Sequence, residues 1–302
     1  MNNTTTTNFN RITDHTSFND RTILAVYVVI LTLIIAINTA ALVILYRTKR
    51  NGYSAAFSFY LVHLFIMNIL TNLLDIPLDI AEKAYSACLT ATQCAFYTYV
   101  NWALMAVLVY SHLAITLNRL WAVLHPHSYR QRHTLRLAVG ICCLIWIVVH
   151  LCVVPLFAYR LTHQSENDVC LLDMTDYSSD LSVPVQIWGT VVFVVLFLLL
   201  TLAIVLLYPL IEGIRQRARR RVAITSGSSL YGRKMVADPR TFRMLLALTV
   251  SLLCAWMPQL IWLLLEDWIT LDPVTQDLVD LVLDYTWTVQ ALLDPIMFIA
   301  VF

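Results

Sequence analysis

The feature that most constrains the fold is a series of long stretches without Asp, Glu, Lys or Arg. Six of these stretches are long enough to cross a bilayer, which takes about 20 apolar residues per helix. A seventh carries two carboxylates, Asp284 and Asp294, but is otherwise apolar. In chain order the stretches are residues 22–46, 51–74, 84–118, 137–159, 181–211, 244–265 and 281–302.

Composition favours a bilayer over water as the solvent of these stretches. Hydrophobic residues make up 59% of the chain and charged residues 13%, whereas soluble domains have about 45–50% apolar and about 25% charged residues. The strands of a membrane barrel would be about 10 residues long with alternating polarity, and these stretches are longer and do not alternate. We therefore predict an all-α membrane protein, a bundle of seven transmembrane helices.

The charged residues of the loops predict the orientation of the bundle. Arginine and lysine gather after the first, third and fifth stretches, and acids gather on the opposite side. Basic residues mark cytoplasmic loops, so we expect residue 1 to be outside the cell. Residues 1–21 would form an extracellular tail, and residues 22–302 the seven-helix domain of a multi-pass plasma-membrane protein. Asn2 and Asn3 begin glycosylation acceptor tripeptides, which also arise by chance in Asn/Thr-rich segments.

Particular polar, aromatic and proline residues occur at characteristic positions along the spans. Cys94 and Arg119 lie at the two ends of the third span. The others are Asn38 in the first span, Pro126 in the following loop, Trp146 and Pro155 in the fourth, Tyr208 in the fifth, Cys254-Ala255-Trp256-Met257-Pro258 in the sixth and Asp294-Pro295-Ile296-Met297-Phe298 in the seventh. In this order and spacing the chain resembles the rhodopsin-like G-protein-coupled receptors, of the peptide-receptor type, along almost its whole length.

The resemblance implies a disulfide between Cys94 and Cys170. It would fix the second outer loop over the third helix, at a surface where disulfides persist. Two free thiols, or a bridge between Cys88 and Cys94, are the alternatives.

The resemblance also implies a switch at the cytoplasmic end of the third helix. Arg119 would hold the resting bundle closed and later contact the G protein, and ionisable residues within spans are by default functional. Asn118 stands where the family usually has Asp. The family's second partner for the arginine, an acid at the foot of the sixth helix, corresponds to Asp238. Because Asp238 precedes Pro239, it is equally suited to be a helix N-cap.

Further residues are assigned to activation by the same resemblance. Pro258 would kink the sixth helix beside Trp256. This tryptophan and the bend could form a two-state element that a ligand biases. The alternative is that Trp256 is an ordinary residue of a packed core. The family's Asp on helix two is Asn68 here and its Asn on helix seven is Asp294, so two positions that face each other in the family keep one carboxylate and one amide. The activation and coupling residues are Asn38, Asn68, Asn118, Arg119, Tyr208, Asp238, Trp256, Pro258, Asp294, Pro295 and Phe298.

Other departures from the family pattern weaken parts of this assignment. Leu108 replaces a serine ligand and puts a sodium site in doubt, and Phe298 replaces a tyrosine. The chain ends at Phe302, so we expect the cytoplasmic tail and helix 8 of the family to be absent or truncated.

Acidic residues ring the predicted extracellular mouth and would attract cations; the alternative is an ordinary solvated surface. Asn101 stands where amine receptors of the family have Asp, and Thr288 where visual pigments have the Schiff-base lysine. A basic peptide is the preferred ligand, and a small cation of another kind or an external chemical cue are the alternatives. The predicted ligand-binding residues are Asp75, Asp79, Asn101, Trp102, Asp284, Tyr285 and Trp287.

The expected partners are this extracellular ligand, a heterotrimeric G protein and membrane lipid, with no nucleic acid. The arginine run at residues 215–221 suits anionic lipid or the G protein.

Two other functions fit parts of the pattern. His63, His112 and His150 lie in three successive spans, and three histidines can form a catalytic zinc site. No HExxH is present, so we expect them to hydrogen bond between helices, and we predict no enzyme activity, catalytic residue, metal or cofactor. A decoy receptor that does not signal is the closer alternative, because of Asn118 and Phe298.

Overall fold

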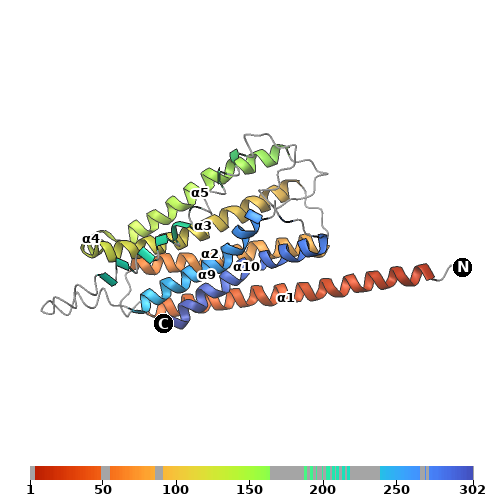
Figure 1. Ribbon diagram of the computed structural model, residues 1–302, viewed down its shortest axis with the longest axis horizontal. Helices are drawn as coiled ribbons and strands as arrows, with labels where there is room; N and C mark the ends of the chain where they lie inside the picture. The colour runs from red at the N-terminus through yellow and green to blue at the C-terminus, as the bar shows by residue number, and fades with distance from the viewer. Residues whose placement is uncertain are drawn as a thin grey trace.

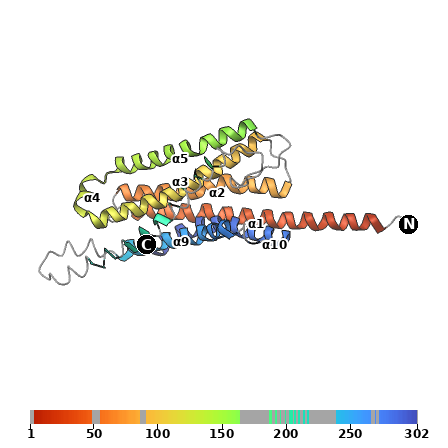
Figure 2. The same ribbon diagram turned by 45° about the horizontal axis from the view of Figure 1, so that its top comes forward.

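Long helices account for almost all of the described chain. The computed structural model describes residues 4–48, 55–85, 91–163, 239–265 and 273–301, with isolated positions between 187 and 217 and at 269 and 272. The long helices run beside one another along one axis (Figures 1 and 2), and the short helix α4 joins α3 to α5. In chain order the helices are α1 (Thr4–Thr48), α2 (Ala55–Tyr85), α3 (Ala91–Leu124), α4 (Pro126–Arg132), α5 (Leu135–His163), α9 (Pro239–Leu265) and α10 (Pro273–Val301).

The packing of the helices defines two ends of the bundle. Helix α2 contacts α1, α3 and α5, while α10 packs on α9 and closes against α1. One end, here called the basic end, is where α1 and α3 finish and α2 and α5 begin, and it includes α4 with Arg130 and Arg132. The opposite end, where α3 and α10 begin, is here called the acidic end. Helix α1 continues past the rest of the bundle at the acidic end (Figure 1).

The predicted spans and the observed helices overlap but do not share their ends. Helix α2 continues beyond residue 74 through Asp75 and Asp79 to Tyr85, and α1 begins at Thr4, inside the segment predicted to be a tail. A helix can continue into polar sequence because its backbone hydrogen bonds are internal. The charge-free stretch therefore predicts the part suited to lipid and not the whole helix. Described positions of the fifth predicted span are mostly helical, and α4 had no counterpart among the predictions.

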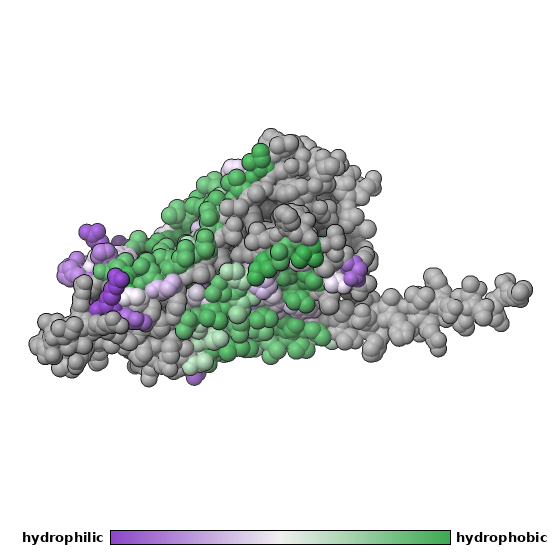
Figure 3. Space-filling model, viewed as in Figure 1, coloured by the Kyte–Doolittle hydropathy of each residue, from purple (hydrophilic) through white to green (hydrophobic). Residues whose placement is uncertain are grey.

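The outer surface of the bundle is apolar. In the described part, four helices are long and apolar enough to cross a membrane, namely Leu24–Arg47, Ala55–Leu78, Ala95–Ala122 and Leu135–Tyr159. Shorter apolar helical segments are Leu246–Pro258 and Thr288–Ala300. Figure 3 shows hydrophobic residues over much of the described part of the face in view, with hydrophilic residues around α4. An exposed apolar patch of this extent marks an interaction surface, and helices of this length and hydropathy suit a bilayer.

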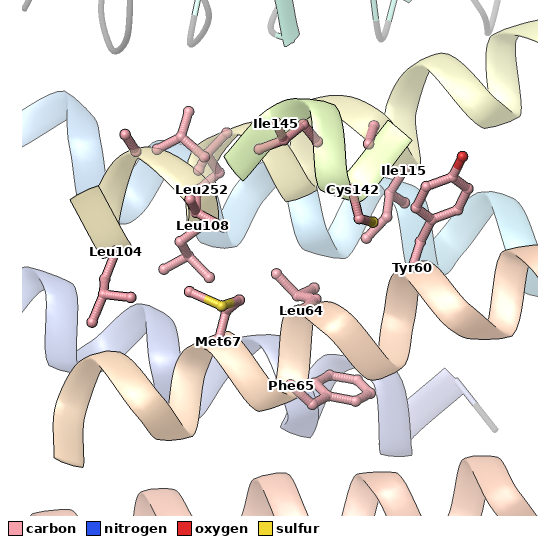
Figure 4. Packing of buried hydrophobic residues seen from close by; sticks show 14 of the residues in the cluster. Tyr60, Leu64, Phe65, Met67, Leu104, Leu108, Ile115, Cys142, Ile145 and Leu252 are labelled. Atoms are coloured by element: carbon pink, nitrogen blue, oxygen red, sulfur yellow. The ribbon is translucent and has the colours of Figure 1, made fainter. Parts of the chain in front are cut away.

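Apolar contacts between α2, α3 and α5 make up the core. Leu64 and Met67 of α2 point toward α3, where Leu108 lies, and Cys142 and Ile145 of α5 complete this layer (Figure 4). Prolines lie inside α2, α5, α9 and α10. Transmembrane helices tolerate them because neighbouring helices satisfy the freed backbone groups.

Truncation of a core leucine tests this packing against a lipid-facing control. Leu64 is fully buried and Leu144 is 58% exposed. We expect Leu64→Ala to lower the free energy of unfolding by about 2–5 kcal/mol, because it leaves a cavity between helices. Leu144→Ala should cost much less, because lipid chains fill the vacated volume. Thermal denaturation of the purified chain in detergent and in nanodiscs measures both, and equal losses would contradict the packing described here.

Candidate functional site

A group of buried polar side chains lies near the middle of the bundle. No member is more than 3% exposed, although the surrounding helices are apolar. We call this group the Asp294 cluster. It joins five helices and consists of Asn38 (α1), Asn68 (α2), His112 (α3), Ser251 (α9), and Gln290 and Asp294 (α10).

The carboxylate of Asp294 is the centre of this cluster. Ser251 Oγ donates to Asp294 Oδ1 at 2.7 Å. Asn68 Nδ2 donates to Oδ2 at 3.2 Å, and His112 Nε2 lies 3.1 Å from the same oxygen. A buried carboxylate is very costly without such partners. Side chains from three other helices are therefore held in place by this one residue of α10, and they in turn stabilise its buried carboxylate.

The contacts of His112 indicate which nitrogen carries its proton. Its Nε2 atom lies 3.0 Å from Gln290 Nε2 as well as near Asp294. Gln290 Oε1 is buried without a hydrogen-bond partner in the described structure. Turning the Gln290 amide over would present this oxygen, as an acceptor, to His112 Nε2–H. The imidazole would then donate from Nε2 to Asp294 and Gln290 together.

Asn38 ties α1 to this centre. Its Nδ2 donates to the carbonyl oxygens of Ile34 and Ala291, each at 2.9 Å. Its Oδ1 accepts from Asn68 at 3.5 Å. The amide thus bridges the backbones of α1 and α10 and extends the cluster toward α2.

The structure bears out one prediction about this region and adds three residues. Asn68 and Asp294 face each other in a hydrogen bond, as the exchange of amide and carboxylate predicted. His112, Ser251 and Gln290 had not been assigned to this site. Their polarity within apolar spans was the available signal, because polar side chains there normally face other helices.

At the basic end, Arg119 lies against α2. Its guanidinium carbon is 3.3 Å from the ring centroid of Phe57, and Phe57 is only 1% exposed. The neighbouring Asn118 is buried, and neither of its amide atoms has a hydrogen-bond partner in the part of the chain that is described. Phe57 had not been assigned to a site, because a phenylalanine in an apolar span carries no distinguishing signal.

Next to this contact, aromatic rings surround His133 in the turn between α4 and α5. Its ring stacks on Tyr129 at 4.4 Å and on Tyr60 at 6.1 Å, and it meets the edge of Trp121 at 5.7 Å. Burial lowers the pKa of His133, and the positive charge of Arg119 lowers it further. The imidazole is therefore held in its neutral form at neutral pH.

The described residues expected to form the activation element lie inside α9 and α10. Trp256 is 2% exposed and packs in the core, and Pro258 lies one half-turn later inside α9. Phe298 is fully buried and meets Phe65 edge-on at 5.3 Å, while Pro295 lies inside α10. Helix α9 begins at Pro239, where the N-cap interpretation of Asp238 placed its start.

At the acidic end, the structure brings two predicted ligand residues together. Asp75 Oδ1 accepts hydrogen bonds from Asn101 Nδ2 at 2.6 Å and from Tyr97 Oη at 3.0 Å. Of the other predicted ligand residues, Trp102 packs against the core cluster and Tyr285 stacks on Tyr27 of α1 at 5.8 Å.

Several predicted site residues lie outside the described structure. The side chains of Asp79, Cys94, Asp284 and Trp287 are not described, although their backbones lie in helices. Asn2, Asn3, Cys170, Tyr208 and Asp238 lie outside the described residues altogether. The predicted disulfide, glycosylation sites and Asp238 partnership thus stay predictions.

The three histidines considered for zinc have separate partners. His63 accepts from Trp146 Nε1 at 3.2 Å and lies 3.0 Å from Ser111 Oγ. His150 lies 2.8 Å from Tyr99 Oη, and His112 belongs to the Asp294 cluster. Among the described residues, no group of three His, Cys, Asp or Glu side chains could hold a metal ion.

An apolar-surfaced helical bundle with a buried polar cluster is typical of membrane proteins, and comparison with known proteins identifies the family. Residues 37–298 match the family described as "7 transmembrane receptor (rhodopsin family)". The chain belongs to this family, whose members are multi-pass plasma-membrane receptors and not enzymes.

Two curated relatives are receptors as well. The Substance-P receptor of Aquarana catesbeiana is 26% identical over 226 residues, covering 70% of this chain and 53% of the relative. G-protein coupled receptor 55 of Mus musculus is 24% identical over 147 residues, covering 47% of this chain and 42% of the relative. The chain thus spans about half the length of these relatives.

Exchanging the two central residues tests the Asp294 cluster. We expect Asp294→Asn to lower the midpoint of thermal unfolding, because His112 and Ser251 lose a charged acceptor. The double variant Asn68→Asp/Asp294→Asn places the carboxylate on α2 instead of α10, and it should stay less stable than the natural chain. Full recovery in the double variant would show that only the pairing between positions 68 and 294 matters.

His133 predicts how stability depends on pH. Its pKa is lowered in the folded chain, so the unfolded chain binds its proton at a higher pH than the folded chain does. This histidine should therefore reduce stability as pH falls below about 6.5, the ordinary pKa of histidine, and should cost nothing at pH 8. His133→Phe keeps a stacking ring without a titrating group. Thermal unfolding between pH 5 and pH 8 should lose part of its pH dependence in this variant, and an unchanged profile would refute the assignment.

Proposed function

We propose that this chain is a receptor for a cationic extracellular peptide and that it signals to a heterotrimeric G protein. The acidic end faces outward in this proposal and the basic end faces the cytoplasm. The observation that carries the proposal is the partly buried carboxylate of Asp75, fixed between α2 and α3 by neutral donors.

The chemistry at Asp75 suits a cation. Tyr97 and Asn101 donate hydrogen bonds that orient its carboxylate, and both of these donors are uncharged. A guanidinium or ammonium group of a ligand would form a charge-assisted hydrogen bond with it, which is roughly twice as strong as a neutral one. Because α2 and α3 already hold the carboxylate in place, the ligand would not have to order it on binding.

The peptide class is supported by family relationship and by charge. One relative is named as a receptor for substance P, which favours a ligand of the peptide type. The sequence places further acidic residues toward the same end of the bundle as Asp75, including Asp79 and Asp284. A surface of one charge sign steers oppositely charged ligands toward the site.

Coupling to the basic end would pass through the Asp294 cluster. Ser251 connects α9 to Asp294, and Trp256 and Pro258 follow on the same helix. A ligand that favours a second arrangement of α9 would have to break or remake the Ser251 contact. Arg119 at the basic end would then contact the G protein.

A decoy receptor is the second candidate, and two observations favour it. Asn118, which stands where the family usually has Asp, is neutral and buried, and its amide atoms have no hydrogen-bond partner in the described structure. Phe298 has no hydroxyl and lies fully buried. Such a chain would bind the ligand without activating a G protein.

Charge removal at Asp75 tests the ligand site. In cells that express the chain, arginine-containing peptides from a pooled library should raise or lower a second messenger. We expect Asp75→Asn to weaken the potency of an active peptide about ten- to hundredfold, the loss of one hydrogen bond to a charged group. Asp272→Asn is the matched control, because Asp272 caps α10 through Thr275 at the same end and Asn caps equally well.

Binding and signalling can be separated in the same experiment. Arg119→Ala should abolish the second-messenger response while labelled peptide still binds at the cell surface. Binding without any response in the natural chain would favour the decoy. Activation by acidic or neutral lipids alone, with no response to any basic peptide, would overturn the proposed ligand class.

A further inference from the structure

We propose that Phe57 is a positioning residue for Arg119, and that its ring holds the guanidinium against α2 while the receptor is at rest. This inference rests on the proposed coupling to a G protein. The juxtaposition that carries it is the guanidinium of Arg119 lying 3.3 Å from the centroid of the Phe57 ring.

The geometry is that of a cation–π contact. A cation within about 6 Å of a ring centroid, over the face of the ring, is attracted by the negative face. Phe57 is 1% exposed and is part of the main core, so the ring side of the contact is shielded from bulk water. Arg119 is partly buried, and a charge at the edge of an apolar span benefits from such a partner, because a charge in an apolar setting is costly.

The first turns of α2 present two rings toward the end of α3. Phe57 and Tyr60 are three residues apart, so they lie on the same face of the helix. Phe57 contacts Arg119, and Tyr60 stacks on His133 in the turn before α5. His133 in turn stacks on Tyr129 of α4. This face of α2 thus contacts both Arg119 and the α4–α5 turn at the basic end.

The contact gives Arg119 a resting position that does not require an acid next to it in sequence. The adjacent residue is the neutral Asn118. A G protein that takes up the arginine would have to draw the guanidinium away from the Phe57 ring. Weakening the ring's attraction should therefore favour the active arrangement without any ligand.

Stepwise fluorination of the ring provides the sharpest test. Phenylalanines with one, two or three fluorine atoms are introduced at position 57 of the full chain, which reduces the negative charge of the ring face while nearly preserving its shape. We expect each added fluorine to lower the thermal stability of the purified receptor and to raise basal nucleotide exchange on added G protein. The full series should shift the resting equilibrium by about three- to thirtyfold, the range of cation–π contacts from exposed to desolvated.

Two controls separate attraction from packing. The same series in an Arg119→Met background should show no trend, because the cation is absent. The series at Phe59, two residues along α2 and partly buried, should also show none, because no cation lies over this ring among the described contacts. Phe57→Trp should preserve the resting state and Phe57→Leu should not.

The outcomes distinguish this inference from the proposed function. A fluorine-dependent loss of stability that requires Arg119 supports the contact even if no G protein responds, and that result would count against the signalling proposal alone. A flat stability series at position 57, or an identical trend in the Arg119→Met background, would overturn the inference whatever the signalling result.

Discussion

The buried carboxylate of Asp294 is the constraint on which the arrangement of the bundle depends. A carboxylate that is 0% exposed is tolerated only where donors converge on both of its oxygens. Ser251, His112 and Asn68 supply these contacts from three different helices. These contacts therefore fix the depth and rotation of α2, α3 and α9 relative to α10. Apolar packing alone would specify this arrangement less precisely.

Three sites with polar or charged side chains connect different sets of helices. At the acidic end Asp75 joins α2 to α3, and at the basic end Phe57 and Arg119 join the same two helices. Between these ends, the Asp294 cluster is where α9 and α10 are connected to that pair. Helix α9 reaches the Asp294 cluster through Ser251, whose Oγ donates to Asp294 Oδ1. A rearrangement of α9 against a fixed α2–α3 pair is the movement that this distribution of contacts allows most readily.

The sequence predicted the bundle well because charge-free stretches of bilayer length leave few alternatives to helices. It also predicted that Asn68 would face Asp294, since an exchanged amide and carboxylate retain complementary hydrogen bonds. Helix ends could not be predicted in this way, as α2 shows by continuing past Asp75 to Tyr85. Predicting the roles of His112 and Gln290 would have required knowing how α3 and α10 are rotated about their axes. Predicting the contact of Phe57 with Arg119 would have required knowing the position of α2 relative to α3, which no local sequence pattern encodes.

The hydrogen on the His112 imidazole is the sharpest test of a bundle organised around Asp294. Nitrogen NMR of the chain with labelled histidine, in nanodiscs, reports which imidazole nitrogen of His112 carries a proton. We expect the hydrogen on Nε2, in a strong hydrogen bond, and a marked change of this resonance in Asp294→Asn. A bare Nε2, or a resonance that does not respond to Asp294→Asn, would contradict a bundle organised around this carboxylate.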